Sequence, residues 1–272
     1  MPAPGPTKVL LKRKRRPLVD GFPCGRICDD HVKEAQLIQS SLVPLGSLSD
    51  KSVEVSFRFL PVSEVSGDFA DFFYLPNGRI GLYLGDVVGK GLSAAMYGAL
   101  VMGTLRGIHK SGTEAAKVLT TLNERLMQRP LAGRFCCTLY AVFDPANGEL
   151  VFSNAGLPFP LLTSKNRCQP LGKGGFPSGM FSGAAYEQHA VQLSPGDSVL
   201  FATDGLHESS NRDGAEFCSR HMAESWAQCW RKSADESLEF LFESLHVFSD
   251  GGSADDDVTA LVLKVPEIGV ST

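Results

Sequence analysis

Two apolar runs joined by Pro76-Asn77-Gly78 constrain the fold of this chain more than any other feature. The runs are residues 69–75 and 79–87, and Asn-Gly between two apolar runs is a strong signal for a β-hairpin. Asp68 precedes the first run, and Asp86 lies near the end of the second. Because a hairpin brings its two outer ends together, the sequence predicts that these carboxylates meet at one edge of a sheet.

Two further aspartate sites adjoin apolar runs in the same way. Asp204 follows the run 198–203, and Asp255-Asp256-Asp257 precedes the run that begins at Val258. Each site alone is more often a turn than a ligand, so their joint occurrence carries the weight. Clustered carboxylates repel each other unless a cation lies among them. Without consistent His or Cys companions they suit Mg²⁺ or Mn²⁺ rather than zinc. The sequence therefore predicts a divalent-metal enzyme acting on phosphate.

Apolar periodicity predicts the other elements. Period-two patterns and apolar runs predict strands at 53–59, 69–75, 79–87, 135–144, 149–154, 186–193, 198–203 and 258–265. Helical patterns occupy 29–43, 92–109, 113–128, 215–232 and 234–248. Turns at 145–148 and 194–197 each join two strands as a hairpin, and 171–185 reads as a flexible loop. Because hairpins dominate, we expect mainly antiparallel sheets with helices on their outer faces.

Composition is that of a globular protein with a core, since 43% of the 272 residues are hydrophobic and 21% are charged. No apolar stretch approaches the roughly 20 residues that span a bilayer, and the N-terminus lacks the apolar core of a secretory signal. We therefore expect a cytoplasmic location. Seven cysteines without framework spacing predict reduced thiols. The neighbours Cys136 and Cys137 point to opposite faces of a strand, so we expect them not to pair.

The net charge of −4 hides a basic N-terminus. Residues 1–16 hold six of the 26 basic residues and no acid, which leaves 20 basic residues against 30 acidic ones. We expect residues 1–28 to be a Pro-rich disordered tail, with a weak contact to nucleic acid, a membrane or an acidic partner as the alternative. The helix 29–43 has an apolar stripe that needs a partner surface. That surface is either its own domain or a regulatory or self-associating partner.

Two other kinds of active site lack support. The segment 85–91 contains Gly-Lys, but Leu84 and Gly91 stand where a Walker phosphate loop needs Gly and then Ser or Thr. There is no Gly-x-Ser-x-Gly elbow, and neither His189 nor His207 has a visible nucleophile partner.

Short motifs follow one another between about residues 30 and 265. They are 66–69 (SGDF), 85–95 (GDVVGKGLSAA), 122–123 (LN), 154–156 (NAG), 194–197 (SPGD), 203–208 (TDGLHE) and 256–259 (DDVT). In this order they resemble a metal-dependent (type 2C, PPM) protein serine/threonine phosphatase of the bacterial RsbU/SpoIIE-like branch. The resemblance implies an α+β fold, a four-layer α-β-β-α sandwich of two mainly antiparallel sheets flanked by helices.

The resemblance also implies a site with two Mn²⁺ or Mg²⁺ ions. Asp86 would bridge both ions, and the backbone carbonyl of Val87 would bind one of them. Asp204 and Asp256 would complete the second site. Asp68 would lie against the cluster and bind directly or through water. These four aspartates are the expected catalytic residues.

Two positions qualify this expectation. Asp257 is not an expected ligand, because the family's ligand is the first residue of its Asp-Asp pair. Gly156-Leu157-Pro158 stands where the family often has Gly-His-x-Pro. Leu157 removes a polar group that could have met substrate or water, so we expect altered rate or specificity and retained activity.

The implied activity is hydrolysis of phosphoserine or phosphothreonine on a protein. The implied substrate is a phosphorylated STAS-type anti-sigma-factor antagonist in a partner-switching circuit. The expected division is a tail at 1–28, a lead helix at 29–45, a PPM-type phosphatase domain at 46–266 and a tail at 267–272. The alternatives are a catalytically weak regulatory module of the same fold and a metal-dependent phosphodiesterase. The acidic body disfavours a nucleic-acid substrate.

Overall fold

The computed structural model describes residues 29–44, 46–109, 114–165, 167–217, 219–250 and 256–267. Its elements are α1 Asp29–Leu42, β1 Leu48–Ser49, β2 Glu54–Leu60, β3 Phe69–Tyr74, the 3₁₀ turn η1 Pro76–Gly78, β4 Ile80–Val87, α2 Leu92–Ile108, α3 Ala115–Gln128, β5 Cys136–Asp144, β6 Glu149–Ala155, β7 Leu161–Ser164, β8 Arg167–Pro170, β9 His189–Gln192, β10 Ser198–Ala202, α4 Asp204–Glu208, α5 Ser219–Ala227, α6 Ala234–Phe248 and β11 Val258–Lys264. The predicted tail 1–28, and the predicted tail 267–272 beyond residue 267, lie outside the described residues.

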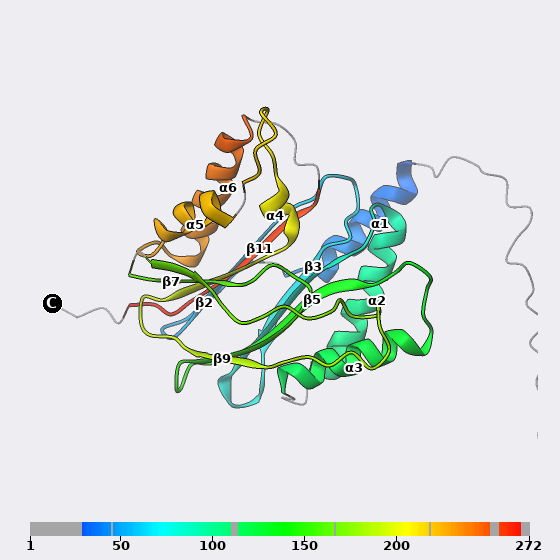
Figure 1. The fold of residues 1–272 in the computed structure, drawn as a ribbon, viewed down its shortest axis with the longest axis horizontal. Helices are drawn as coiled ribbons and strands as arrows, with labels where there is room; N and C mark the ends of the chain where they lie inside the picture. Colours follow the sequence, from blue (N-terminus) through cyan, green and yellow to red (C-terminus); the bar gives the residue numbers. More distant parts are fainter. Residues whose placement is uncertain are drawn as a thin grey trace, which may run out of the picture.

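Two antiparallel sheets form the centre of the fold. One has the strand order β1-β2-β11-β10-β7-β8, and the other has β3-β4-β5-β6-β9. Helices α5 and α6 cover the first sheet, and α2 and α3 cover the second with α1 beside α2 (Figure 1). The predicted four-layer α-β-β-α sandwich is confirmed. No helix in the described ranges is both long enough and apolar enough to cross a bilayer.

Three apolar clusters hold these layers together. Tyr83 and Leu105 belong to the cluster between the five-stranded sheet and its helices. Leu84 and Phe201 belong to the cluster between the two sheets. Trp226, which is fully buried, belongs to the cluster between the six-stranded sheet and α5 and α6. Alternate residues of a central strand such as β4 therefore enter different cores, which explains why its sequence is apolar on both faces.

The expected hairpin between 186–193 and 198–203 is wrong. Strand β9 pairs with β6 in one sheet, whereas β10 pairs with β7 and β11 in the other. The connecting turn crosses between the sheets: Leu193 N donates to Gly148 O, and Gly196 N donates to Val265 O. Leu193 and Val199 both enter the core between the sheets, so two apolar runs that flank a turn share a core without pairing.

Other expected elements differ in extent. The helix expected at 215–232 is confined to α5, because backbone turns follow it at Gln228, Cys229 and Lys232 before α6 begins. Strands β7 and β8 were not predicted, since each has only four residues. The short helix α4 was also not predicted. Residues 171–185 form no helix or strand, in agreement with the loop prediction, although Ser178 within them is fully buried.

Candidate active site

The β3–β4 hairpin brings Asp68 and Asp86 together. Phe69 pairs with Gly85 at the end of the ladder, so Asp68 precedes the first residue of the pair and Asp86 follows the second. The charge of Asp86 contributes, after burial, to raising the pKa of Asp68, so the two carboxyl groups lie close together. At the turn, Asn77 adopts a φ of 66°, a left-handed conformation that asparagine tolerates well. The predicted meeting of the two carboxylates at one sheet edge is confirmed.

Asp68 is also tied to the opposite sheet. Thr203 Oγ1 donates to Asp68 Oδ2 over 2.9 Å, and Thr259 Oγ1 donates to the same oxygen over 2.5 Å. The threonines follow β10 and lie within β11, respectively. Asp68 is only 3% exposed, and a buried carboxylate needs such donors. The rims of the two sheets therefore meet at this side chain.

Asp257 has a structural role in the same region. Its carboxylate accepts hydrogen bonds from Val62 N at 2.8 Å, Ser66 Oγ at 2.6 Å and Gly67 N at 3.2 Å. Ser66 Oγ in turn accepts from Asp68 N at 2.9 Å. Asp257 thus fixes the segment that carries Asp68, and its oxygens are already engaged. The expectation that Asp257 is not a ligand stays a prediction.

Asp204 and Asp256 lie on the six-stranded sheet's side of the cluster. Asp204 begins α4, and its neighbour Gly205 packs so closely that a Cβ atom there would lie 2.1 Å from Asp257 O. Only glycine allows this approach, which brings the start of α4 against residues 256–257. Asp256 Oδ2 lies 3.2 Å from Lys90 Nζ.

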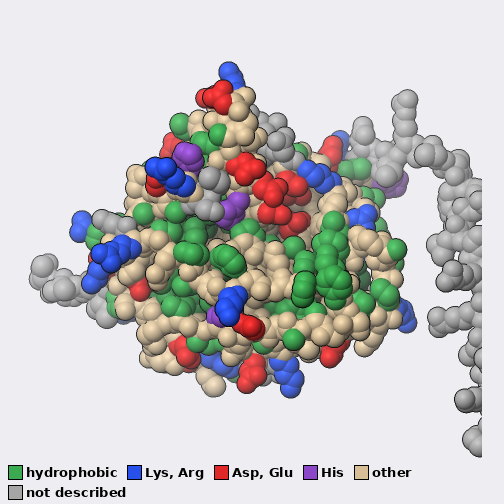
Figure 2. Space-filling model, in the orientation of Figure 1, with side chains coloured by type: hydrophobic (Ala, Val, Ile, Leu, Met, Phe, Trp, Pro, Cys, Tyr) green, Lys and Arg blue, Asp and Glu red, His purple; other side chains and the backbone are tan. Residues whose placement is uncertain are grey.

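Mutual repulsion marks the four aspartates as one electrostatic unit. Burial, followed by the charge of Asp204 and then those of Asp256 and Asp257, raises the pKa of Asp86 to about 6. Burial and the charge of Asp86 raise the pKa of Asp68 well above its usual value. Figure 2 shows acidic side chains gathered on one face of the molecule. A cation placed among these groups would relieve the repulsion.

The available donors fit a hard divalent cation. A Cβ atom at Gly67 would lie 2.9 Å from Val87 O and 3.3 Å from Asp86 Oδ1, so these two oxygens share one small space that glycine leaves open. Carboxylates and a carbonyl are the ligands that Mg²⁺ and Mn²⁺ prefer. Within the described ranges, no group of three or more His, Cys, Asp or Glu side chains is arranged so that it could hold a metal ion. The individual ligand roles therefore stay predictions.

Leu157 differs from the sequence-based expectation. Its side chain is 5% exposed and packs in the core between the sheets, so the position does not face solvent or the carboxylates. Asn154 closes the local turn by accepting from Leu157 N and donating to Leu157 O, each at 2.9 Å. An apolar side chain is therefore compatible with this site.

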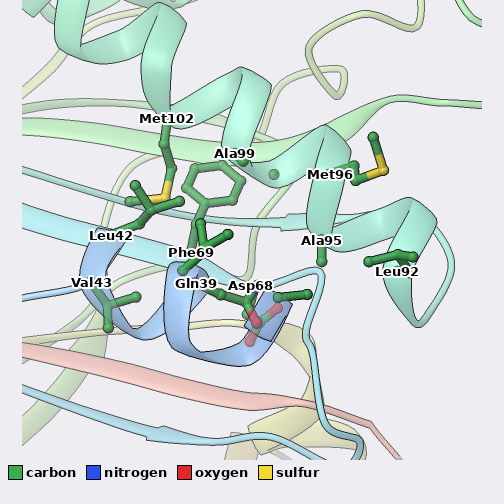
Figure 3. Close-up of a pocket in the computed structure, with 13 residues that line it drawn as sticks. Gln39, Leu42, Val43, Asp68, Phe69, Leu92, Ala95, Met96, Ala99 and Met102 are labelled. Carbon is green, nitrogen blue, oxygen red and sulfur yellow. The ribbon is translucent and has the colours of Figure 1, made fainter. Parts of the chain in front are cut away.

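Helix α1 lies against the segment that carries Asp68. Gln39 Nε2 donates to Ser66 O at 2.6 Å, and Ser66 N donates to Gln39 Oε1 at 2.9 Å. An apolar pocket of about 160 Å³ lies between α1 and α2, and Figure 3 shows Asp68 at its edge beside Gln39. Leu37 and Ile38 on α1 are 73% and 59% exposed.

Sequence reasoning missed the residues that position the ligands. Thr203, Thr259 and Ser66 each lie in a motif noted from the sequence, directly beside or near an aspartate. Their hydroxyl groups could have identified them from the sequence, because a buried carboxylate requires hydrogen-bond donors nearby. Gln39 gave no such signal, since it lies on a separate helix.

Comparison with known proteins places the chain among phosphatase-related sequences. It is 24% identical over 260 residues to protein IcfG of Synechocystis sp. (strain ATCC 27184 / PCC 6803 / Kazusa), covering 85% of this chain and 41% of IcfG. It is 23% identical over 242 residues to phosphoserine phosphatase RsbU of Bacillus subtilis (strain 168), covering 86% of this chain and 69% of RsbU. The chain thus spans most of RsbU but less than half of IcfG.

Solved structures share the fold. The SiaA-PP2C domain of Pseudomonas aeruginosa superposes with a TM-score of 0.75 at 20% identity, covering 87% of this chain and 95% of that domain. RsbX in complex with magnesium superposes with a TM-score of 0.60 at 14% identity, covering 80% of this chain and 98% of RsbX. The family model of stage II sporulation protein E (SpoIIE) matches residues 76–266, more than two thirds of the chain. The chain belongs to the SpoIIE family.

Proposed function

We propose that this protein is a metal-dependent protein phosphatase that hydrolyses phosphoserine or phosphothreonine. The observation that carries the proposal is the convergence of Asp68, Asp86, Asp204 and Asp256 between the rims of the two sheets, where burial and then the charges of neighbouring aspartates raise the pKa values of Asp68 and Asp86. The name of RsbU, a phosphoserine phosphatase, supports the same activity. We assign the catalytic unit to residues 46–266, preceded by the lead helix.

The proposed metal site uses the roles expected from the family. Asp86 would bridge two ions, Val87 O would bind one of them, and Asp204 and Asp256 would hold the other, with Asp68 alongside. When bound, Mn²⁺ or Mg²⁺ would supply a Lewis acid and an acidified water for attack on phosphorus. The magnesium in the RsbX structure is consistent with this choice of ion.

The surrounding residues orient the cluster. The two threonine donors hold one oxygen of Asp68 in place. Asp257 fixes the backbone of residues 66 and 67. Preorganised groups of this kind avoid the cost of reordering during the reaction.

A cysteine nucleophile is disfavoured at this site. Cys137 pairs with Asp86 in the β4–β5 ladder. Burial, with the charges of Asp86 and Asp204, raises the pKa of its thiol to about 12. The thiolate is the reactive form, so Cys137 is protonated at neutral pH. Water is therefore the proposed nucleophile, and no phosphoenzyme is required.

We propose a phosphorylated STAS-type anti-sigma-factor antagonist as the substrate, within a partner-switching circuit. The resemblance to the RsbU/SpoIIE-like branch supports this choice. The predicted cytoplasmic location would suit such a substrate and stays a prediction.

Three assays distinguish a phosphatase from a phosphodiesterase and from a regulatory module without activity. The protein is given Mn²⁺ with a small phosphomonoester, with a phosphoserine-bearing STAS protein, and with single-stranded and duplex DNA. The proposal expects phosphate release from the first two and no cleavage of DNA. DNA cleavage would favour a phosphodiesterase. Binding of the phosphoprotein without hydrolysis would favour a regulatory module.

We also propose that α1 is a regulatory or self-associating element. Its Gln39 hydrogen-bonds both backbone polar groups of Ser66, and exposed Leu37 and Ile38 lie on the same helix. A partner that moves α1 would therefore move the segment that carries Asp68. Packing of α1 on its own domain alone is the competing explanation.

A further inference from the structure

Lys90 lies at the opening of the carboxylate cluster. Its Nζ is 3.2 Å from Asp256 Oδ2. The lysine stands on the loop between β4 and α2, directly after the strand that carries Asp86, whereas Asp256 precedes β11 in the other sheet. The ion pair therefore spans the rims of both sheets.

The backbone of this loop is held in place. Arg134 Nη1 donates to Val88 O at 2.6 Å, and Arg134 Nη2 donates to Ser93 Oγ at 2.9 Å. Val88 N donates to Phe135 O at 3.2 Å. Gly89 has a φ of 94°, and a Cβ atom there would lie 2.6 Å from Arg134 Nη1. The loop thus presents the residue after Gly89 from a fixed position.

Exposure increases from the buried end of the cluster to Lys90. Asp68 is 3% exposed, whereas the side chains of Asp256 and Lys90 are 48% and 58% exposed. The cluster therefore opens to solvent at this ion pair, and a phosphorylated side chain would enter there. Because a phosphate dianion is repelled by ionised carboxylates, a cation at the opening favours its approach.

We propose that Lys90 binds the phosphoryl group of the substrate, an inference that rests on the proposed function. Its ammonium has three donors on a flexible stem, which suits phosphate as a point charge. In the present structure the ammonium offsets the charge of Asp256. A divalent cation held by Asp256 would offset the same charge, so the ammonium of Lys90 would no longer be needed to neutralise that carboxylate.

The test compares Lys90→Gln and Lys90→Arg with Lys173→Gln. Lys173 is a matched control, because it is an exposed lysine whose Nζ lies 3.8 Å from Glu187, outside the cluster. The measurements are KM and kcat for p-nitrophenyl phosphate, calorimetric affinity of the Mg²⁺-loaded protein for inorganic phosphate, and Mg²⁺ affinity. Losing one charged hydrogen bond should weaken phosphate affinity about ten- to a hundredfold in Lys90→Gln. KM should rise with it, Mg²⁺ binding should be kept or tightened, and Lys90→Arg should restore most of the phosphate affinity.

Unchanged phosphate affinity in Lys90→Gln, together with tighter Mg²⁺ binding, would overturn the inference and leave Lys90 as a competitor for Asp256 alone. Equal weakening in Lys173→Gln would overturn it as well, since the effect would then be one of general charge. Phosphate binding does not require turnover. An inactive wild-type protein would therefore contradict the proposed function, while weaker phosphate binding by Lys90→Gln would still support the role of Lys90.

Discussion

Thr203 Oγ1 and Asp68 Oδ2 form a 2.9 Å hydrogen bond between the two sheets, across 135 positions of sequence. Thr203 Oγ1 also accepts from Thr259 N at 3.0 Å, so one hydroxyl joins Asp68 to the N-terminal end of β11. The position of Asp68 therefore depends on both sheets being assembled.

Thr203→Val should impair both stability and activity. The change keeps the shape of the side chain but leaves Asp68 with one donor fewer and Thr259 N without an acceptor. We expect a loss of about 1–3 kcal/mol in the free energy of unfolding and a lower kcat, measured by urea denaturation and phosphate release. Ser198→Ala is the control, because the buried Ser198 hydroxyl has no partner among the described residues. Equal losses in both variants would contradict the role of Thr203.

Gly205→Ala should disrupt the cluster through the backbone. The added methyl group would lie 2.1 Å from Asp257 O, so α4 must move away from residues 256–257. We expect a loss of more than about 2 kcal/mol in stability and weaker Mn²⁺ binding by calorimetry. Gly103→Ala in α2 meets nothing within 4 Å and should stabilise by about 0.5–1 kcal/mol. A Gly205→Ala variant with wild-type stability and Mn²⁺ affinity would show that Gly205 does not pack tightly against Asp257 O.

Gln39→Ala should uncouple α1 from the site with little effect on global stability. The variant loses both hydrogen bonds to the backbone of Ser66, so Asp68 becomes less well positioned. We expect lower turnover and weaker Mn²⁺ affinity with a Tm within about 4 °C of wild type. Gln36→Ala, on the exposed side of the same helix, should change none of these.

Deletion of residues 1–45 should change the activity or the oligomeric mass in solution. No change in either would reject a regulatory role for α1.

Asp86→Asn should stabilise the metal-free protein at neutral pH. An acid whose pKa is raised in the folded state binds its proton more tightly there than in the unfolded state. Stability therefore falls as the pH rises from the ordinary aspartate pKa of 3.8 to the folded-state pKa of about 6. In EDTA at pH 7.5, the variant should exceed wild type by up to about 3 kcal/mol, and the gain should shrink toward pH 4. A loss of stability that is the same at both pH values would contradict the repulsion within the cluster.

Cys137→Ala should retain most of the activity. Since the pKa of the thiol is raised to about 12, it carries no thiolate that could attack phosphorus at neutral pH. Iodoacetamide at pH 8 should likewise leave turnover unchanged over an hour. Complete inactivation by either treatment would favour a cysteine mechanism.

Local signals allowed much of the fold to be predicted. The Asn77-Gly78 turn fixed the hairpin that joins Asp68 to Asp86, and apolar periodicity located α1, α2 and α6 within a residue or so of their ends. The turn 194–197 misled because its local sequence is the same whether the chain returns in one sheet or crosses to the other. That choice depends on partners far along the chain, β6 and β11.

The site likewise contains residues that could be predicted from the sequence and residues that could not. The aspartates are visible in the sequence because each ends or precedes an apolar strand. Their supporting contacts are not visible, since Thr203, Thr259 and Gln39 reach the cluster only after the sheets and α1 assemble. Motif position alone led to the expectation that Leu157 removes a polar group able to meet substrate or water, whereas Leu157 packs in the core between the sheets.

The decisive experiment for metal-dependent phosphatase activity at the aspartate cluster measures Mn²⁺-dependent release of phosphate from a phosphoserine protein. Wild type, Asp86→Asn and Asp204→Asn are compared, with Asp213→Asn as an exposed acidic control outside the cluster. We predict turnover by wild type and the control, and none by the two cluster variants. Near-wild-type, Mn²⁺-dependent turnover in either cluster variant would contradict this prediction.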